Sequence, residues 1–476
     1  MPNSSGNAHI LVFPYPGQGH MIALLDLAHK LAVRGLTITV LVTPKNLPIL
    51  NPLLTKNPST QTLVLPFPAH PEIPPGVENL KDLPPTHFKF MIGAMAELHD
   101  PLFQWFKSHP SPPAAIISNF FLGWTNKLAI ELNIRRVVFS TSGAMGMAMI
   151  DHLWHDLPTR TDPNDPNELV TFSKLPKSPT YPWWQLSPIF RTYKKGDPYS
   201  EFIRNGMVEN VASYGIAINT FSEFESVYLD HMRYGLGYNK VWAVGPLLPE
   251  DAAPAERGGS GSIENAGLLS WLHTCPVRSI VYVCFGSQVV LTNKQMKGVA
   301  AALECSGARF VWCAKQPTKG HVEGEYGVVP AGFEDRTAGR GVVIKGWAPQ
   351  LLILKHRAVG SFLTHCGWNS TLEGLMAGVV MLAWPMRADQ YINATLLVDQ
   401  MKVAVRVCEG YGTVPNSAEL GRAMAESVSE DRSEDPVRVR ATEMRKIACD
   451  AVKEGGSSFK DLDSLVRDLC GLDLAQ

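Results

Sequence analysis

The feature that most constrains the fold of this chain is a regular alternation of short apolar runs with helical segments. Residues 9–13, HILVF, are an apolar run typical of a buried strand, and a turn-rich stretch follows them. Residues 21–34 carry apolar side chains at helical spacing and stop at Gly35, and residues 36–42 form a second β-rich run. Strand, helix and strand in this order predict a βαβ unit, which implies a parallel sheet covered by helices on both faces.

The same pattern recurs along the rest of the chain. One more helix is predicted at residues 125–132, and further strands are predicted at residues 115–118, 137–140, 281–285, 309–313, 341–344 and 359–363. Two Pro-rich stretches, residues 68–85 and 159–188, are predicted to leave the sheet and to line a substrate pocket.

The length of the chain predicts two α/β domains. At roughly 150 residues per domain, 476 residues suit two or three domains, and α/β domains run large. Residues 250–264 are rich in Ala, Pro, Gly and Ser, which predicts a linker between a first domain at 1–249 and a second at 265–455. Because open α/β sheets bind ligands at the carboxyl ends of their strands, we expect a ligand cleft between the two domains.

The composition favours small-molecule partners. Lys and Arg number 43 and Asp and Glu number 44, so the chain lacks the basic surface that nucleic acid or an anionic membrane attracts. The sequence has no signal-peptide pattern and no apolar run of roughly 18 residues, which predicts a soluble, cytoplasmic protein. We expect its cysteines to be reduced, since no CxxC pair occurs among Cys275, Cys284, Cys305, Cys313, Cys366, Cys408, Cys449 and Cys470.

A candidate phosphate site lies at residues 359–374, VGSFLTHCGWNSTLEG. This segment predicts a strand, a turn and a helix that begins near Asn369, and the free N–H groups and dipole of a helix start attract phosphate. Asn369, Ser370 and Thr371 add side-chain donors, and His365 at the strand end can donate to the same anion. A plain N-cap is the alternative interpretation, which the segment alone does not exclude.

A longer window around this segment carries a family resemblance. It opens with Trp347-Ala348-Pro349-Gln350 and closes with Trp384-Pro385 and Asp389-Gln390, and further motifs are FPYPGQGHM, ISNFFLGWT, VWAVGPL, VYVCFGSQ and EGGSS. The chain thereby resembles the plant secondary-product UDP-glycosyltransferases, glycosyltransferase family 1, over nearly its whole length. The resemblance implies the GT-B fold, in which two Rossmann-like α/β domains face each other across a cleft. It also implies an inverting, UDP-sugar-dependent hexosyltransferase.

The resemblance further implies the residues of the UDP-sugar site. An indole offers a flat face to uracil, a carboxylate accepts from two ribose hydroxyls, and an amide both donates and accepts. The implied residues are Trp347 and Ala348 for uracil, Glu373 for ribose, Ser287, His365, Asn369 and Ser370 for the diphosphate, Asp389 and Gln390 for the sugar with Trp368 nearby, and Gln350 in the same site.

The residue at position 390 bears on the sugar. In this family a Gln there tends to accompany glucose, whereas a His tends to accompany galactose, arabinose or rhamnose. Gln390 therefore implies UDP-glucose as the donor. Arg387 departs from the small or acidic residue that the family more often has at that position.

The resemblance implies a general base at His20, which ends the stretch Gly17-Gln18-Gly19-His20. An acceptor hydroxyl must lose its proton as it attacks the anomeric carbon while UDP leaves from the opposite face, and imidazole titrates near neutrality. A structural role is the alternative for a lone His, and here the resemblance favours catalysis.

Asn119 departs from the family pattern. The family orients the catalytic His with an Asp in a segment of the form ISDxFLGWT, whereas this chain has Asn119 in that place. We expect the amide oxygen of Asn119 to accept from the imidazole N–H and to fix its tautomer, without stabilising the imidazolium by charge. Three consequences stay open: a preference for acidic phenols or carboxylic acids, formation of a C-glycoside, or another carboxylate in place of the missing one.

The acceptor pocket is expected in the first domain, among side chains suited to a flat apolar ligand. The candidates are Tyr15, Phe90, Phe120, Phe121, Met145 and Trp184, each of which is as readily an ordinary core residue. The first half of the chain also resembles the branch that includes flavonol and dihydroxybenzoate glycosyltransferases, which implies a phenolic acceptor.

Other classes of protein fit the sequence less well. A dinucleotide-dependent oxidoreductase would need a third Gly after Gly17-x-Gly19 and an acidic residue after Val42-Thr43, and both are missing. A hydrolase would need a GxSxG elbow, and His365-Cys366 has no second cluster that would complete a metal site. A non-catalytic sugar-nucleotide-binding protein stays open because of Asn119.

The remaining expectations concern partners and assembly. The resemblance implies no metal or other cofactor, because helix dipoles and hydrogen-bond donors neutralise the leaving UDP. It implies UDP-glucose and a small aromatic acceptor as partners, and a monomeric protein. Residues 456–476 are expected to form a helix that crosses back onto the first domain.

Overall fold

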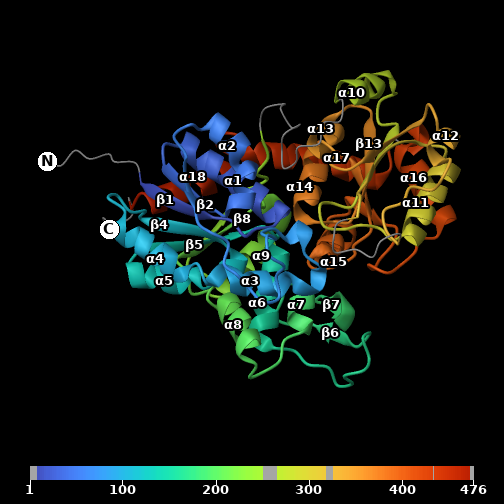
Figure 1. The fold of residues 1–476 in the computed structure, drawn as a ribbon. Helices are drawn as coiled ribbons and strands as arrows, with labels where there is room; N and C mark the ends of the chain where they lie inside the picture. Colours follow the sequence, from blue (N-terminus) through green and yellow to red (C-terminus); the bar gives the residue numbers. More distant parts are fainter. Residues whose placement is uncertain (1–7, 250–264, 318–324, 433, 472–476) are drawn as a thin grey trace. The chain divides into compact units, whose positions relative to one another are not determined.

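The computed structural model describes residues 8–249, 265–317, 325–432 and 434–471, and it divides the chain into two compact units (Figure 1). The first unit comprises residues 1–248 and 451–476, and the second comprises residues 249–450. The predicted linker at residues 250–264 lies outside the described residues.

The described part of the first unit contains a seven-stranded sheet in the order β3-β2-β1-β4-β5-β8-β9, and each neighbouring pair is parallel. This is the doubly wound order, in which the chain starts at the centre and builds outward in both directions. The strands are β1 (His9–Phe13), β2 (Thr37–Val42), β3 (Gln61–Val64), β4 (Ala115–Asn119), β5 (Arg135–Ser140), β8 (Gly215–Ile218) and β9 (Val241–Ala243).

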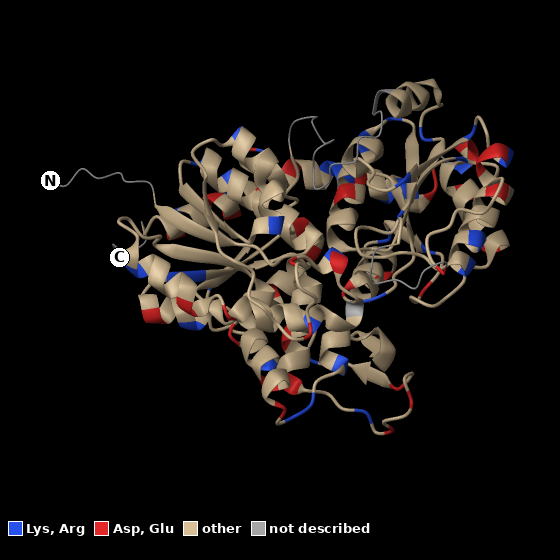
Figure 2. Cartoon of the chain, in the orientation of Figure 1, with Lys and Arg blue, Asp and Glu red and all other residues tan. Residues whose placement is uncertain are grey.

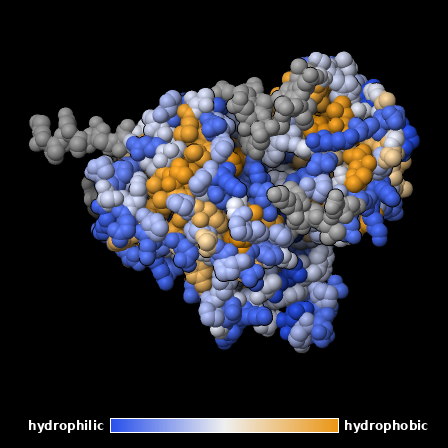
Figure 3. Space-filling model, viewed as in Figure 1, coloured by the Kyte–Doolittle hydropathy of each residue, from blue (hydrophilic) through white to orange (hydrophobic). Residues whose placement is uncertain are grey.

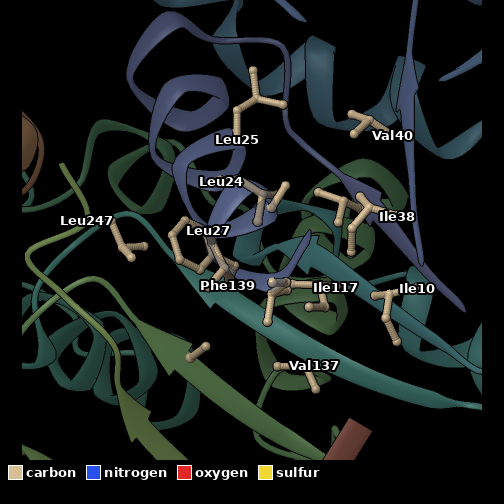
Figure 4. Packing of buried hydrophobic residues seen from close by; sticks show 14 of the residues in the cluster. Ile10, Leu24, Leu25, Leu27, Ile38, Val40, Ile117, Val137, Phe139 and Leu247 are labelled. Carbon is tan, nitrogen blue, oxygen red and sulfur yellow. The ribbon is translucent and has the colours of Figure 1, made fainter. Parts of the chain in front are cut away.

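Helices cover both faces of this sheet, as the βαβ pattern predicts. Trp124 packs edge-on against Phe13 of β1 on one face, and the apolar cluster of Figure 4 lies on the other. The helices are α1 (Gln18–Val33), α2 (Asn51–Lys56), α3 (Phe88–Ala96), α4 (His99–Ser108), α5 (Thr125–Leu132), α6 (Ala144–Asp156), α7 (Pro188–Arg191), α8 (Pro198–Val208), α9 (Ser222–Tyr234) and α18 (Ser457–Leu469).

The cluster of Figure 4 shows why a helix follows β1, although α1 begins at Gln18, three residues before the predicted start, and therefore includes His20. Leu24 and Leu27 of α1 belong to the same apolar cluster as Ile10 and Ile117 of the central strands, and all four side chains are fully buried. Burial of a Leu or Ile side chain stabilises the folded state by about 1.5–3 kcal/mol. The helical spacing of these apolar residues therefore holds the segment after β1 at a fixed place on the sheet.

Helix α18 belongs to the first unit by its contacts. Leu462, Leu465 and Leu469 join the same apolar cluster. Asp463 pairs with Arg34, which directly follows α1, at 2.8 Å, and Asp461 accepts from the backbone N–H of Ala243 at 2.7 Å. The segment 457–469 thus completes the core of the unit that contains the N-terminal half of the chain.

The described part of the second unit repeats the same architecture with six parallel strands in the order β12-β11-β10-β13-β14-β15. The strands are β10 (Ile280–Cys284), β11 (Arg309–Ala314), β12 (Gly341–Lys345), β13 (Val359–Thr364), β14 (Val380–Ala383) and β15 (Ala404–Arg406). The helices are α10 (Asn265–Thr274), α11 (Asn293–Ser306), α12 (Phe333–Arg336), α13 (Gln350–Lys355), α14 (Trp368–Ala377), α15 (Gln390–Ala394), α16 (Ser417–Val428) and α17 (Pro436–Val452).

The Pro-rich stretch at residues 159–188 leaves the large sheet, as predicted, and forms a hairpin of its own. Strands β6 (Leu169–Thr171) and β7 (Thr180–Pro182) pair antiparallel there. In the other Pro-rich stretch, residues 68–85, the backbone N–H of Leu80 donates to Pro16 O at 2.9 Å, directly before α1. This second stretch therefore borders the segment that carries Gly17 to His20.

The surface has a mixed character. Lys and Arg lie interspersed with Asp and Glu over the helices of both units in Figure 2, which agrees with the balanced charge. On the face shown in Figure 3, hydrophobic patches are separated by hydrophilic side chains. Exposed large hydrophobic residues such as Val33, Ile130 and Leu169 come from separate elements. No helix in the described part of the chain is long and apolar enough to cross a membrane, and all eight cysteines are free thiols.

Candidate active site

The two sheets place the predicted site residues at equivalent points. In the first unit the order of strands reverses between β1 and β4, where His20 follows the carboxyl end of β1 and Asn119 is the last residue of β4. In the second unit it reverses between β10 and β13, which are followed by Ser287 and His365. Such switch points are where open α/β sheets bind ligands.

His20 lies in the first turns of α1, and its imidazole is held through one nitrogen. The Nδ1 atom of His20 lies 3.1 Å from Nδ2 of Asn119 and 3.0 Å from Oγ1 of Thr141. Among the residues that the structure describes, Nε2 of His20 has no hydrogen-bond partner. Burial lowers the pKa of His20 to about 4, so the imidazole is neutral at pH 7.

The orientation of Asn119 differs from the expectation drawn from the sequence. Its oxygen Oδ1 accepts from the backbone N–H of Phe121 at 3.1 Å, so its amide nitrogen faces His20. The expectation that the amide oxygen accepts from the imidazole was wrong. Asn119 is the last residue of β4 and the N-cap of the following 3₁₀ turn (Phe120–Leu122). Its oxygen accepts the N–H of Phe121 in this turn and therefore does not face the imidazole.

Aromatic rings surround the imidazole. The ring centroids of Tyr15, Phe120 and Phe121 lie 5.5, 5.9 and 5.3 Å from that of His20. Tyr15 donates its hydroxyl to Phe88 O at 3.1 Å, which leaves its ring at the side of His20. The structure thus brings three of the predicted acceptor residues to the predicted base.

The other three acceptor candidates lie in other surroundings. Phe90 packs against Tyr199, with ring centroids 5.7 Å apart. Met145 is buried in the first turn of α6, with its backbone N–H on Glu225, and Trp184 lies in the 3₁₀ turn (Trp183–Gln185) that follows β7. The described contacts join none of these side chains to the His20 imidazole.

Two residues of this region were missed by the sequence analysis. Thr141 follows β5 and touches His20, as described above. Glu225 of α9 is buried, and its carboxylate accepts from the backbone N–H groups of Ala144 and Met145, at 2.8 Å each, at the start of α6. The position of Thr141 could have been noticed in the sequence, because Thr141 directly follows a predicted strand, where residues of a ligand site are expected. Glu225 had none, because its partners lie about 80 positions earlier in the chain.

In the second unit, His365 occupies a narrow slot between two glycines. A Cβ atom on Gly286 would lie 2.6 Å from its Nε2, and one on Gly367 would lie 2.5 Å from the same atom. The Nδ1 atom of His365 is buried and has no hydrogen-bond partner among the described residues. Burial, with the positive charge of Arg387, lowers the pKa of His365 to about 3, so the ring is neutral. Helix α14 begins directly after this slot.

A side-chain network joins the two ends of the predicted nucleotide site. Gln350, the first residue of α13, donates through Nε2 to Ser370 Oγ at 3.0 Å and to Glu373 Oε2 at 2.7 Å. Helix α13 packs against α14 (Figure 1), and Trp347 and Ala348 directly precede α13, with Trp347 partly exposed. This network holds the buried Glu373 carboxylate of α14 against Gln350, the first residue of α13.

Hydrogen bonds connect the loop before α15 to the loop that carries His365. Gln390 accepts through Oε1 from the backbone N–H groups of Met386 and Arg387, at 3.0 and 3.1 Å. Asn393 donates to Cys366 O at 2.9 Å and to Asp389 Oδ2 at 3.3 Å. Asp389 and Gln390 therefore lie beside the His365 loop.

The remaining predicted residues complete this arrangement. Arg387 donates to Gln288 O at 3.3 Å, which joins the loop before α15 to the turn that carries Ser287. Trp368 and Asn369 form the first turn of α14. The predicted UDP-sugar residues thus lie in the loops that follow β10, β12, β13 and β14 and in the helices α13, α14 and α15 that come after these loops. In the described part of the chain, no group of three or more His, Cys, Asp or Glu side chains is arranged to hold a metal ion.

Comparisons with known proteins agree with this geometry. A family model described as UDP-glucoronosyl and UDP-glucosyl transferase matches residues 268–430. UDP-glycosyltransferase 89B2 of Stevia rebaudiana is 55% identical, over 98% of this chain and 100% of its own length. The chain belongs to the plant secondary-product UDP-glycosyltransferase family. It is therefore a UDP-dependent glycosyltransferase.

Two further relatives bear on this UDP-glycosyltransferase. The flavonol 3-O-glucosyltransferase UGT89B1 of Arabidopsis thaliana is 50% identical, over 99% of this chain and 98% of its own length. The crystal structure of Arabidopsis thaliana UGT89C1 complexed with UDP-L-rhamnose is 40% identical, with a TM-score of 0.81 over 98% of this chain and 100% of that chain. The two Rossmann-like sheets are thus those of the GT-B fold, as the sequence motifs predict.

Proposed function

We propose that this enzyme transfers glucose from UDP-glucose to a hydroxyl of a flavonol or a related small phenolic, with inversion at the anomeric carbon. The observation that carries the acceptor class is the imidazole of His20 among the rings of Tyr15, Phe120 and Phe121. Flat aromatic ligands stack on such rings, and a phenolic hydroxyl is then within reach of the imidazole. The name of the relative UGT89B1, a flavonol 3-O-glucosyltransferase, supports the same class.

The nucleotide is proposed to bind at the carboxyl ends of β10 and β13. Trp347 would stack on uracil, the Ala348 backbone would bind the edge of the base, and Glu373 would accept from the ribose. The slot of His365 and the first N–H groups of α14 would hold the diphosphate, with Ser287 opposite. The start of a helix of ten residues offers both free N–H donors and a positive dipole end to that anion.

The sugar is proposed to be glucose on the evidence of Gln390. Its carbonyl oxygen is occupied by two backbone N–H groups, so its amide nitrogen is the end that can donate to a sugar hydroxyl. Asp389, which is held by Asn393, would accept from a neighbouring hydroxyl. UGT89C1 was solved with UDP-L-rhamnose, and a direct comparison of donors is therefore part of the test.

In the proposed reaction, the acceptor oxygen attacks C1 of the sugar as the bond from C1 to the diphosphate oxygen breaks. The α-linked donor gives a β-linked product, and His20 interacts with the acceptor oxygen. The departing diphosphate would be stabilised by the α14 terminus and its neighbouring side chains. We propose that no metal takes part, in which case EDTA leaves the rate unchanged and added Mg²⁺ does not raise it.

The experiment is a two-way panel. The protein is incubated with UDP-glucose or UDP-rhamnose and with flavonols, simple phenols and benzoic acids, and the products are identified by mass spectrometry. We expect acid-labile O-glucosides of flavonols, formed with UDP-glucose and formed much more slowly by His20→Ala. Faster turnover with UDP-rhamnose would contradict the choice of sugar. Acid-stable products would indicate C-glycosylation, and UDP-glucose binding without any product would indicate a non-catalytic binder.

A further inference from the structure

We propose that Asn119 holds His20 with its proton on Nε2, so that the imidazole offers the acceptor a hydrogen-bond donor and the enzyme selects acceptors that bind as anions. The substrate class is then phenols of low pKa and carboxylic acids. This inference rests on the proposed function, because it concerns the acceptor of the same reaction. It is carried by the hydrogen-bond pattern around His20.

The first step concerns what an amide can do in this place. A carboxylate accepts on both sides, so an Asp would accept from the Phe121 N–H with one oxygen and from an imidazole N–H with the other. An amide accepts on one side only. The Phe121 N–H lies 3.1 Å from Oδ1, and the side that is left to His20 carries the Nδ2 hydrogens. Asn119 therefore donates to Nδ1, and the ring proton must lie on Nε2.

The opposite orientation of the Asn119 amide, with Oδ1 and Nδ2 exchanged, is disfavoured. Rotation would place Nδ2 against the Phe121 N–H, so that two donors would face each other inside the protein. Asn119 is fully buried, and water cannot satisfy the donors that this rotation would leave without acceptors. The 3₁₀ turn (Phe120–Leu122) thus fixes the amide, and the amide fixes the imidazole.

The other groups around His20 do not reverse the pattern. Thr141 can donate its hydroxyl to Nδ1, since a hydroxyl serves as donor or acceptor. Tyr15 faces the ring from the segment after β1, and burial together with Tyr199 raises its pKa well above the ordinary value, so it stays neutral. Phe120 and Phe121 carry no titratable group. Within the described residues, His20 takes part in no ion pair, so no carboxylate draws a proton to Nδ1.

The consequence for the reaction is a change in what His20 contributes. With its proton on Nε2, the imidazole cannot accept the proton of a neutral hydroxyl at that atom. An acceptor that has already lost its proton to solvent is instead bound by Nε2–H. Its oxygen anion forms the bond to C1, the bond from C1 to UDP breaks, and UDP takes the electron pair and the negative charge. No proton moves on the enzyme in this step.

The test compares phenols of similar size that span a range of pKa values, with kcat/KM measured against pH. For the wild-type enzyme we expect the rising limb of each profile to follow the pKa of the acceptor. In Asn119→Asp, a carboxylate oxygen accepts from Nδ1–H and Nε2 becomes a base. The rising part of the profile of kcat/KM against pH should then lie at the same pH for every acceptor. The kcat/KM of this variant should rise about tenfold for weakly acidic phenols, because Nε2 can now accept their proton, and it should change little for acidic phenols.

A matched control is Asn133→Asp, which makes the same chemical change at an exposed position at the end of α5. It should leave all profiles as in the wild type. Thr141→Val should also keep the acceptor-dependent limb, because Asn119 alone sets the tautomer. A wild-type limb that is identical for all acceptors would overturn the proposal.

A direct readout needs neither sugar nor acceptor. In protein labelled with ¹⁵N-histidine, the nitrogen shifts of His20, assigned by its loss in His20→Ala, show which ring atom carries the proton. We expect Nε2–H in the wild type and Nδ1–H in Asn119→Asp. A wild-type spectrum with Nδ1–H would refute the inference, even if Asn119→Asp failed to fold. Failure to glycosylate any phenol would instead count against the proposed function.

Discussion

At the scale of single residues, the slot around His365 depends on the absence of side chains beside it. Gly367 has φ −62° and ψ 144°, a conformation that alanine adopts without strain. What disfavours a side chain there is therefore the close approach to His365, because a Cβ atom would lie 2.5 Å from Nε2, well inside van der Waals contact. A substitution of Gly367 therefore tests the contact with the His365 ring without introducing backbone strain.

We predict that Gly367→Ala displaces the His365 ring and weakens UDP binding by about tenfold or more, since hydrogen bonds to a charged group contribute about 1.5–3 kcal/mol. Isothermal titration calorimetry with UDP measures this. Gly267→Ala is the control, because a Cβ atom at that position of α10 meets no other atom within 4 Å. Equal affinities in the two variants would mean that the His365 ring does not hold the diphosphate.

The residue types of both sites could be predicted from the sequence, because motifs such as GQGH and HCGWNS carry them. The direction of the hydrogen bond between Asn119 and His20 could not. It depends on a backbone N–H two positions after Asn119 that competes for the same oxygen, and sequence spacing does not show which donor is satisfied first. Thr141 was missed for a related reason, since its contact with His20 joins segments 121 positions apart.

At the scale of elements, helix α6 has its N-terminus capped by another helix. Its N-cap residue, Gly143, has no side chain to satisfy the first N–H groups. The carboxylate of Glu225 takes their place, and it also accepts from Thr220 Oγ1 at 2.6 Å. Glu225 reaches them because its own backbone, at φ −132° and ψ 28°, departs from the helical geometry of α9. Burial raises the pKa of Glu225, and these hydrogen bonds oppose the rise.

We predict that Glu225→Ala lowers the free energy of unfolding by about 2–4 kcal/mol, because it leaves several buried donors without an acceptor. Glu225→Gln should lower it by nearly as much, about 2 kcal/mol, because an amide accepts on one side only and its NH2 group would face the backbone N–H of Ala144 or Met145. Urea denaturation measures both. Glu223→Ala, two positions away with its carboxylate on the exposed Ser457 hydroxyl, should change it by less than about 0.5 kcal/mol. Similar losses at positions 223 and 225 would contradict the capping role.

Elements themselves were more predictable than their caps. The strand at residues 9–13 and the helix at 125–132 have the predicted bounds in the structure. A run of buried apolar residues or a helical period is a local pattern, and burial on the sheet enforces it. The cap of α6 comes from α9, about 80 positions later in the chain, and no local pattern announces it.

At the scale of the whole molecule, buried titratable groups set the dependence of stability on pH. The unfolded chain binds a proton at each His below about pH 6.5, whereas His20 and His365 stay neutral in the folded state down to about 4 and about 3. Stability is therefore lost as the pH falls below about 6.5. Asp151 acts in the opposite sense, because burial raises its pKa to about 8, against the hydrogen bond that it accepts from Tyr238 at 2.9 Å. The folded chain keeps this proton while the unfolded chain has lost it above about pH 4, so stability is also lost as the pH rises toward 8.

A comparison of the wild type with Asp151→Asn from about pH 6.5 to 8 isolates the contribution of Asp151, because the histidines that the unfolded chain still protonates near pH 6.5 titrate identically in both proteins. Each pH unit then changes the free energy of unfolding by about 1.4 kcal/mol, so we predict a loss of about 2 kcal/mol across this interval. Asp151→Asn cannot ionise and should abolish this slope, whatever constant offset the amide introduces. Thermal unfolding at several pH values compares the slopes, with Asp156→Asn on the same helix as control. The pKa of Asp156 is lowered by Lys174 and His152 despite some burial, so its titration lies below the interval and its removal should leave the slope intact. Parallel curves for the wild type and Asp151→Asn would show that Asp151 is already ionised in the folded enzyme at neutral pH.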